Sequence, residues 1–230
     1  MLKISERLAT VAGLIPQGSD FVDIGTDHGY VPIWLFQNGR IRSAIAMDVN
    51  KGPLARAKEN RDKYGFTEVM DIRLSNGFEK LKPGEGDSVL IAGMGGPLMI
   101  RIIEDGRENA SSIQTWVLQP QSEIPSVRRY LHEHGFVIVE EIMLKDEGKY
   151  YMAMKAVVGK ADSWNDLEYL FGKFLLEEKH PVLNEFIHKE IQVYEKIEKQ
   201  LQLSNQTETT RYKEVKSYLA SLNEALTYFE

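Results

Sequence analysis

The sequence contains no cysteine, which excludes disulfide bonds and thiolate metal sites and favours a cytoplasmic protein. It also lacks any apolar run close to the roughly 20 residues that a membrane-spanning helix needs, so we expect no membrane partner. The N-terminal residues mix charges and lack the apolar core of a signal peptide. No spaced set of His, Asp and Glu suggests a metal site. These absences leave a globular protein without a bound metal.

An excess of basic charge is absent too, since 28 Lys and Arg stand against 34 Asp and Glu. The acidity is uneven: residues 161–230 hold 8 basic and 13 acidic side chains, whereas residues 1–160 hold 20 and 21. A near-neutral first part still permits a local basic face. The composition also changes after Gly159, where glycine becomes rare. We therefore predict two domains, at residues 1–160 and 161–230.

The first domain alternates between strand and helix patterns. Predicted helices cover residues 4–15, 30–37, 52–64, 97–105 and 124–134, and predicted strands cover residues 21–24, 43–47, 69–74, 88–92 and 115–118. Residues 136–143 and 149–158 form a predicted hairpin. Such alternation predicts βαβ units in a mostly parallel, Rossmann-like α/β sheet with an antiparallel edge.

The second domain is predicted to be helical. Leu183–Leu201 and Tyr212–Phe229 carry apolar residues at intervals of three and four, separated by the polar stretch Ser204–Glu208. This pattern favours an antiparallel, coiled-coil-like hairpin, preceded by a linking helix at residues 167–178. The seam at 212–229 also permits dimerisation. Two complementary seams in one chain make the hairpin the simpler interpretation, and we expect a monomer.

A glycine loop follows the first predicted strand, in the run Asp23-Ile-Gly-Thr-Asp-His-Gly-Tyr30. Gly25 permits a tight turn and close approach of a ligand, and Gly29 precedes the helix. Asp48 ends the second strand 23 positions after Gly25, where an acid binds ribose hydroxyls. Asp27 stands at the second glycine position of the dinucleotide fingerprint, and its carboxylate suits an ammonium group better than a pyrophosphate. The pattern resembles class I methyltransferases that use S-adenosylmethionine.

Two further segments have alternative interpretations. Asn76-Gly77 follows the third strand, where the cofactor's adenine is expected, but it is equally an ordinary Asn-Gly turn. Gly93-Met-Gly-Gly-Pro97 follows a strand and opens a helix, as a nicotinamide site does. Its third fingerprint position is Leu98 and no acid ends the next strand, so we reject a dinucleotide there.

Three stretches together resemble one family. They are Asp23–Pro32, Ile91–Gly96 and Leu118–Gln121 followed by Val127–Leu131. With the helical hairpin, they are similar to the bacterial tRNA (adenine-22)-N1-methyltransferase family, TrmK, over essentially the whole chain. The resemblance implies methyl transfer from S-adenosylmethionine to adenine N1 in the D-arm of tRNA.

This resemblance suggests roles for residues near the cofactor loop. Asp27 stabilises the cationic product, or is only a cofactor contact or helix cap. The backbone of Gly93 and Met94 cradles the base, or its glycines merely permit packing. The predicted cofactor ligands are Asp23, Gly25, Asp27, His28, Gly29, Asp48, Asn76 and Gly77. His28 is equally a residue that only fixes the geometry of the loop.

The predicted substrate contacts lie around the same loops. Tyr30 stacks on a base or packs in its helix, and Gly95 lies beside Met94 in the base cradle. Gln119 and Gln121 read the adenine edge or are simply solvated. Arg7 and Arg128 are the predicted phosphate ligands.

Two other functions remain open from the sequence. A class I methyltransferase acting on a small molecule or a protein agrees with the low basic charge. A non-catalytic interaction protein built around the hairpin is disfavoured by the intact cofactor acids. Salt-sensitive tRNA binding separates the first alternative from a tRNA methyltransferase, and loss of cofactor binding favours the second.

Overall fold

A computed structural model describes residues 2–230, which divide into two compact units. The first unit holds the described residues up to Ile142 together with Tyr151–Ser163. The second holds Met143–Tyr150 and Trp164–Glu230. The tip of the hairpin at 143–150 therefore belongs to the helical unit, although its strands begin and end in the first one. Within the described residues, no helix is long and apolar enough to cross a membrane.

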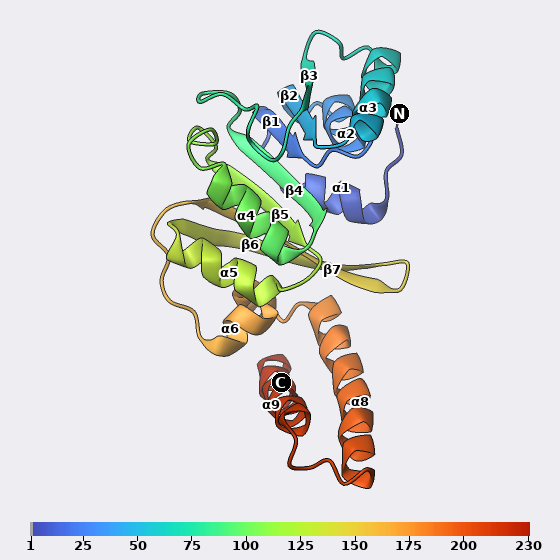
Figure 1. Cartoon of the computed structure of the whole chain (residues 1–230), viewed down its shortest axis with the longest axis vertical. Coiled ribbons are helices and arrows are strands. Elements are labelled where there is room, and N and C mark those ends of the chain that lie inside the picture. Colours follow the sequence, from blue (N-terminus) through green and yellow to red (C-terminus); the bar gives the residue numbers. More distant parts are fainter. Residues whose placement is uncertain (1) are drawn as a thin grey trace. The chain divides into compact units, whose positions relative to one another are not determined.

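The first unit is built on a sheet whose strands alternate with helices (Figure 1). The strands are β1 (Ser19–Ile24), β2 (Ile41–Asp48), β3 (Met70–Leu74), β4 (Ser88–Met94), β5 (Thr115–Pro120), β6 (Phe136–Asp146) and β7 (Lys149–Val158). The helices are α1 (Glu6–Ala12), α2 (Tyr30–Gln37), α3 (Lys51–Tyr64), α4 (Gly96–Asp105) and α5 (Ile124–Glu133). Each predicted element of this unit is present, with bounds that differ by a few residues.

The strand order is β3-β2-β1-β4-β5-β7-β6. Strands β1 to β5 pair in parallel, and β7 pairs antiparallel with β5, with Leu118 opposite Met154. The chain moves outward from β1 to β3 and then returns to β4 on the other side of β1. Because crossovers are right-handed, this reversal opens a crevice at the carboxyl ends of β1 and β4, which is where open α/β sheets bind ligands. The predicted Rossmann-like fold is confirmed.

The core of the unit follows from the sequence of its central strands. Val89, Leu90 and Ile91 of β4 are almost fully buried, as expected for a strand covered on both faces. Val11 and Ala12 of α1 lie in the same apolar cluster as Ile33 and Leu35 of α2. This packing fixes α1 against the sheet, and with it the side chains that α1 presents to the crevice.

The second unit contains the helices α6 (Asp166–Phe171), α7 (Lys173–Glu177), α8 (Pro181–Leu203) and α9 (Thr210–Leu226). The single linking helix predicted at 167–178 is wrong, because α6 and α7 are separate. Gly172 lies between them with a φ of +100°, a backbone conformation that no helix continues through.

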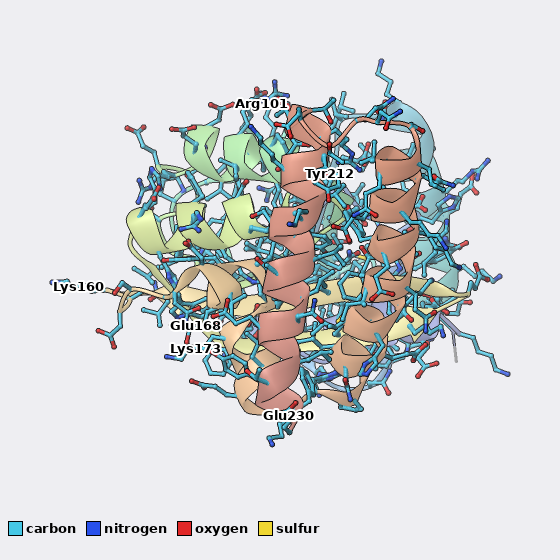
Figure 2. All side chains as sticks on the ribbon, turned by 90° about the horizontal axis from the view of Figure 1, so that it is seen from below. Arg101, Lys160, Glu168, Lys173, Tyr212 and Glu230 are labelled. Carbon is cyan, nitrogen blue, oxygen red and sulfur yellow. The ribbon has the colours of Figure 1, made fainter. Side chains whose placement is uncertain are left out.

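Helices α8 and α9 lie side by side as a hairpin (Figure 2). Leu183 and Ile187 of α8 and Val215, Leu219 and Leu222 of α9 are buried. At the other end of α8, Gln202 Nε2 donates a hydrogen bond of 3.0 Å to the Tyr212 hydroxyl of α9. The helical hairpin is present as predicted, and the coiled-coil geometry of its seam stays a prediction.

Candidate active site

The glycine loop after β1 forms the floor of a cavity of about 370 Å³ at the carboxyl ends of the central strands. Gly25 has a φ of +77°, and a Cβ atom there would collide with Cε of Met94 from β4. The amides of Gly25 and Thr26 both donate to the Met47 carbonyl, at 2.8 and 2.9 Å. This loop is therefore held tightly, and only glycine leaves its surface open to a ligand.

Three carboxylates line the cavity: Asp23 at the end of β1, Asp27 in the glycine loop and Asp48 at the end of β2. Burial raises the pKa of Asp23 to about 7, and the nearby carboxylates of Asp48 and Asp27 add to the rise. A cationic ligand would relieve both effects by stabilising the ionised form. The cluster therefore favours a ligand that carries an ammonium or sulfonium charge.

Asp48 is set up to accept from hydroxyl groups. Its Oδ1 accepts the Asn50 amide at 2.6 Å, which leaves the second carboxylate oxygen free to bind. The next residue, Val49, is 63% exposed, an unusual state for a large apolar side chain. A carboxylate that can accept from ribose hydroxyls, next to an exposed apolar side chain that can contact an adenine ring, fits a nucleoside. The cavity therefore suits S-adenosylmethionine, which joins a nucleoside to a cationic amino acid.

The opposite side of the cavity comes from the ends of β4 and β5. Gly93, Met94 and Gln121 line it. The backbone N–H of Gln121 donates to the Met94 carbonyl at 2.9 Å, and the backbone N–H of Gly96 donates to the Ser122 carbonyl at 3.1 Å. These bonds tie the two loops together. The segment Gly93–Met94, which we call the Gly93–Met94 ledge, is thereby fixed beside the cavity floor.

Arg7 of α1 is the one cation among the residues that line this cavity. Its Nη1 donates to Oε1 of Gln119 at 2.7 Å, and its guanidinium carbon lies 5.0 Å from the centre of the Tyr151 ring. The side chain is thus held by β5 and β7, on the side of the cavity away from Asp48.

Comparison with known proteins decides the family. A profile of the family described as tRNA (adenine(22)-N(1))-methyltransferase, TrmK, matches residues 21–224. The chain belongs to the TrmK family. The curated tRNA (adenine(22)-N(1))-methyltransferase of Bacillus subtilis strain 168 is 34% identical to it over 217 residues, or 92% of this chain and 91% of the relative.

Solved structures of similar proteins agree with this TrmK assignment. Sp1610 of Streptococcus pneumoniae, in complex with S-adenosyl-L-methionine, is 32% identical, with a TM-score of 0.85 over 97% of this chain and 100% of that one. TrmK of M. capricolum, in complex with S-adenosyl-homocysteine, is 27% identical, with a TM-score of 0.86 over 99% of each chain. The predicted family and class I methyltransferase fold are confirmed.

The structure of this TrmK protein corrects two predicted substrate contacts. Arg128 is not a phosphate ligand, because its side chain is fully buried and its Nε donates to Oε1 of Glu141 at 2.8 Å. A buried arginine needs such a carboxylate to balance its charge. Gln119 does not read a base edge either: it is 0% exposed, and its amide oxygen accepts from Arg7.

The adenine role of Asn76 and Gly77 stays a prediction, because the structure places both residues outside the lining of the main cavity. Asn76 and Gly77 line a separate small cavity of about 30 Å³ with Arg101 and Ile102. The Asn76 amide nitrogen donates to Glu79 at 3.0 Å, as in an ordinary turn. Val49, which directly follows Asp48, offers an exposed apolar side chain close to the cavity.

Three loop residues support the cavity floor or its rim. His28 has a φ of +60°, and its Nε2 lies 3.0 Å from Oδ1 of Asp27. Its ring stacks on Tyr30 at 5.1 Å, and Tyr30 lines the cavity. Gly29 is the N-cap residue of α2, with a φ of +68°, and lies close to Met70 and Ala57. Gly95 precedes α4 and faces Ser122.

The sequence reading missed Leu8, Val49 and Tyr151. Leu8 lines the cavity from α1, and the one available signal was its position one residue after Arg7. Val49 follows Asp48 directly, so an apolar side chain after the ribose acid could have indicated it. Tyr151 is brought to Arg7 only by the pairing of β7 with β5, which no local pattern indicates. In the described part of the chain, no cluster of three His, Asp or Glu side chains could hold a metal.

Proposed function

We propose that this protein transfers a methyl group from S-adenosylmethionine to N1 of adenine 22 in tRNA. The observation that carries this proposal is the family match over residues 21–224, together with the cofactor cradle of Gly25, Asp48 and Val49. The relatives bound to S-adenosylmethionine and S-adenosyl-homocysteine support the cofactor.

The cofactor, when bound, supplies a methyl group activated by its sulfonium charge. Asp48 binds the ribose hydroxyls, Val49 packs on the adenine ring, and Asp23 balances the positive charge of the methionine part. We call Asp23, Gly25 and Asp48, which line the cavity, together with the adjacent Val49, the cofactor half of the cavity. Its carboxylates also exclude a pyrophosphate, which keeps dinucleotides out.

The target atom needs orientation more than activation. Adenine N1 carries an in-plane lone pair, so it attacks without first losing a proton and no strong base is required. We call Arg7, Gly93, Met94 and Gln121 the acceptor half of the cavity. The Gly93–Met94 ledge holds the base, Tyr30 stacks on it, and Gln121 and the Gly95 backbone contact its edge.

Asp27 is proposed as the residue that stabilises the methylated, cationic base. Its side chain is 79% exposed and lines the cavity, so its carboxylate is free to approach the base. His28 contacts the same carboxylate, with its Nε2 3.0 Å from Oδ1 of Asp27, and so orients it. A fixed negative charge beside a developing positive charge lowers the barrier of the transfer.

The rest of the chain is proposed to orient the RNA. Adenine N1 faces its partner base in a stem, so the base must leave the stack at a cost of roughly a few kcal/mol. We assign catalysis to residues 1–160 and orientation of the tRNA to the helical part from 161 to 230. Packing between α8 and α9 within one chain supports a monomer, and the lack of cysteine supports a cytoplasmic location.

The test is methyl transfer from labelled S-adenosylmethionine to an unmodified tRNA transcript with adenine at position 22, followed by nucleoside analysis. We expect N1-methyladenosine from this transcript and none from a matched transcript with guanine at position 22. Equal incorporation into both transcripts, or another methylated nucleoside, would overturn the assignment of the target.

A further inference from the structure

Arg7 is held at the cavity by side chains from two strands that lie far from it in the sequence. We propose that Gln119 and Tyr151 are positioning residues, which aim the charged Arg7 guanidinium at a phosphate of the tRNA beside the target adenine. This inference rests on the proposed function. It names the group that the acceptor half recognises and the residues that prepare it.

The geometry fixes Arg7 from α1 and β5, in addition to the Tyr151 ring of β7. Helix α1 is itself anchored, since Ser5 caps it through the Leu8 amide at 3.2 Å and the Leu2 amide donates to Gln37 at 2.7 Å. Gln119 at the end of β5 accepts from Nη1 of Arg7 at 2.7 Å. Its own Nε2 donates to the Pro120 carbonyl at 3.3 Å, which turns the amide oxygen toward Arg7.

The partners of Arg7 hold it without neutralising it. An amide oxygen and an aromatic face attract a guanidinium but carry no net charge. Among the residues that the structure describes, no carboxylate forms an ion pair with Arg7, in contrast to Arg128 with Glu141. Gln119 is fully buried, so water does not compete with Arg7 for its amide oxygen. Arg7 therefore keeps its charge for a ligand.

The position of Arg7 favours an RNA phosphate over the carboxylate of the cofactor. Arg7 is held by β5 and β7, whereas Asp48, the ribose ligand, ends β2 on the far side of β1 and β4. Adjacent strands lie about 4.8 Å apart, so β5 is roughly 14 Å from β2. Arg7 thus lies beyond the methyl-transfer point, where the acceptor enters, and guanidinium groups pair well with phosphate.

The experiment measures the Kd of unmodified tRNA, with saturating S-adenosyl-homocysteine so that no turnover occurs, at several salt concentrations. We expect Arg7→Ala to raise this Kd about tenfold and to reduce the slope of log Kd against log salt by about one contact. Gln119→Glu keeps the hydrogen bond but neutralises Arg7, so it should match Arg7→Ala. Arg42→Ala is the matched control. Arg42 is an exposed arginine that pairs with Asp20 and lies at the end of β2 away from the cavity. Its removal should change neither the Kd nor the slope.

A double-mutant cycle tests whether Gln119 acts through Arg7. Gln119→Leu should weaken tRNA binding in the wild-type background and have no further effect on Arg7→Ala. Tyr151→Phe should restore the affinity that Tyr151→Leu loses, because a phenyl ring still faces the guanidinium. The Kd of S-adenosylmethionine should stay constant in every variant, which also reports a correct fold.

Several outcomes would overturn the inference. Additive losses in the cycle would show that Gln119 acts independently of Arg7. A weaker Kd for S-adenosylmethionine with unchanged tRNA affinity in Arg7→Ala would assign Arg7 to the cofactor carboxylate. Either result leaves the proposed function standing, because the product analysis of the wild-type enzyme decides that question separately. Absence of any tRNA binding by the wild-type chain would reject both.

Discussion

The two halves of the cavity are built differently. In the cofactor half, the proposed ligands come from consecutive segments: Asp23 lies at the end of β1, Gly25 follows it, and Asp48 ends β2. In the acceptor half, Arg7 comes from α1, Met94 from β4 and Gln121 from the loop after β5. The charges differ as well, with carboxylates in one half and a single arginine in the other.

We propose that this difference lets one crevice separate two ligands of opposite charge. Carboxylates around the cofactor half favour a cationic cofactor, and the unneutralised Arg7 favours an anionic RNA backbone. Each half should therefore lose one ligand when it is altered, and keep the other. The predictions that follow test this separation, beginning with the variant that should have the largest effect.

Gly25→Val should abolish cofactor binding. The residue has a φ of +77°, which a β-branched side chain rarely adopts, and the valine side chain would also displace Cε of Met94 at the cavity floor. Calorimetric titration with S-adenosyl-homocysteine measures the loss. Gly39→Val is the matched control, because Gly39 also has a positive φ of +62° but has open space around its Cα. Equal cofactor affinity in the two variants would show that backbone strain, not the cradle, causes the effect.

Asp48→Ala should weaken cofactor binding by roughly 10- to 100-fold, since hydrogen bonds to a charged group contribute about 1.5–3 kcal/mol. The affinity for tRNA should change little, because Asp48 lies in the cofactor half. Binding titrations with each ligand check both statements, and Asp48→Asn should fall between the two proteins. Unchanged affinity for the cofactor would remove the ribose role from Asp48.

Asp27→Asn should lower kcat about tenfold, which corresponds to about 1.4 kcal/mol of transition-state stabilisation. Its effect on the Kd of the cofactor should be much smaller, because the exposed carboxylate is proposed to act on the methylated base. Single-turnover methylation and cofactor titration measure the two effects separately. Equal losses in kcat and in cofactor affinity would make Asp27 a cofactor ligand and would place it in the cofactor half.

Asp23 should make the stability of the cofactor-free protein depend on pH. Its pKa is raised to about 7 by burial, above the value of 3.8 expected in the unfolded chain. The folded state holds this proton more tightly, so the contribution is present below about pH 4 and is lost as the pH rises through about 7. Asp23→Asn should therefore gain Tm relative to the wild type between pH 5 and pH 8, by several degrees. Parallel Tm curves for both proteins would contradict this.

The sequence grouped Asp23, Gly25 and Asp48, which the structure places around one cavity, because these residues lie at the ends of consecutive strands. The run from Asp23 to Tyr30 and the position of Asp48 were sufficient to place a nucleoside cofactor. Among the predicted substrate contacts, Arg128 and Gln119 were wrong, because tertiary pairing decides their surroundings. Nothing near Arg128 shows that Glu141 will neutralise it, and nothing near Gln119 shows that Arg7 of α1 will fold onto it.

The fold shows the same contrast. The apolar spacing within each segment predicted the strands and helices of the sheet unit, because that spacing shows which residues of the segment are buried. Gly172, which separates α6 from α7, was hidden inside an apolar pattern that reads as one helix. Asn76 and Gly77 occupy the expected place after β3, but their turn faces Ile102 and Glu79 instead of the main cavity.

The most direct test of the separation between the two halves is one steady-state experiment on Asp48→Ala and Arg7→Ala, with both substrates varied. We expect Asp48→Ala to raise KM for S-adenosylmethionine and leave KM for tRNA nearly unchanged, and Arg7→Ala to do the reverse. A rise in both KM values for either variant would contradict the account, because it would show that a single residue serves both ligands.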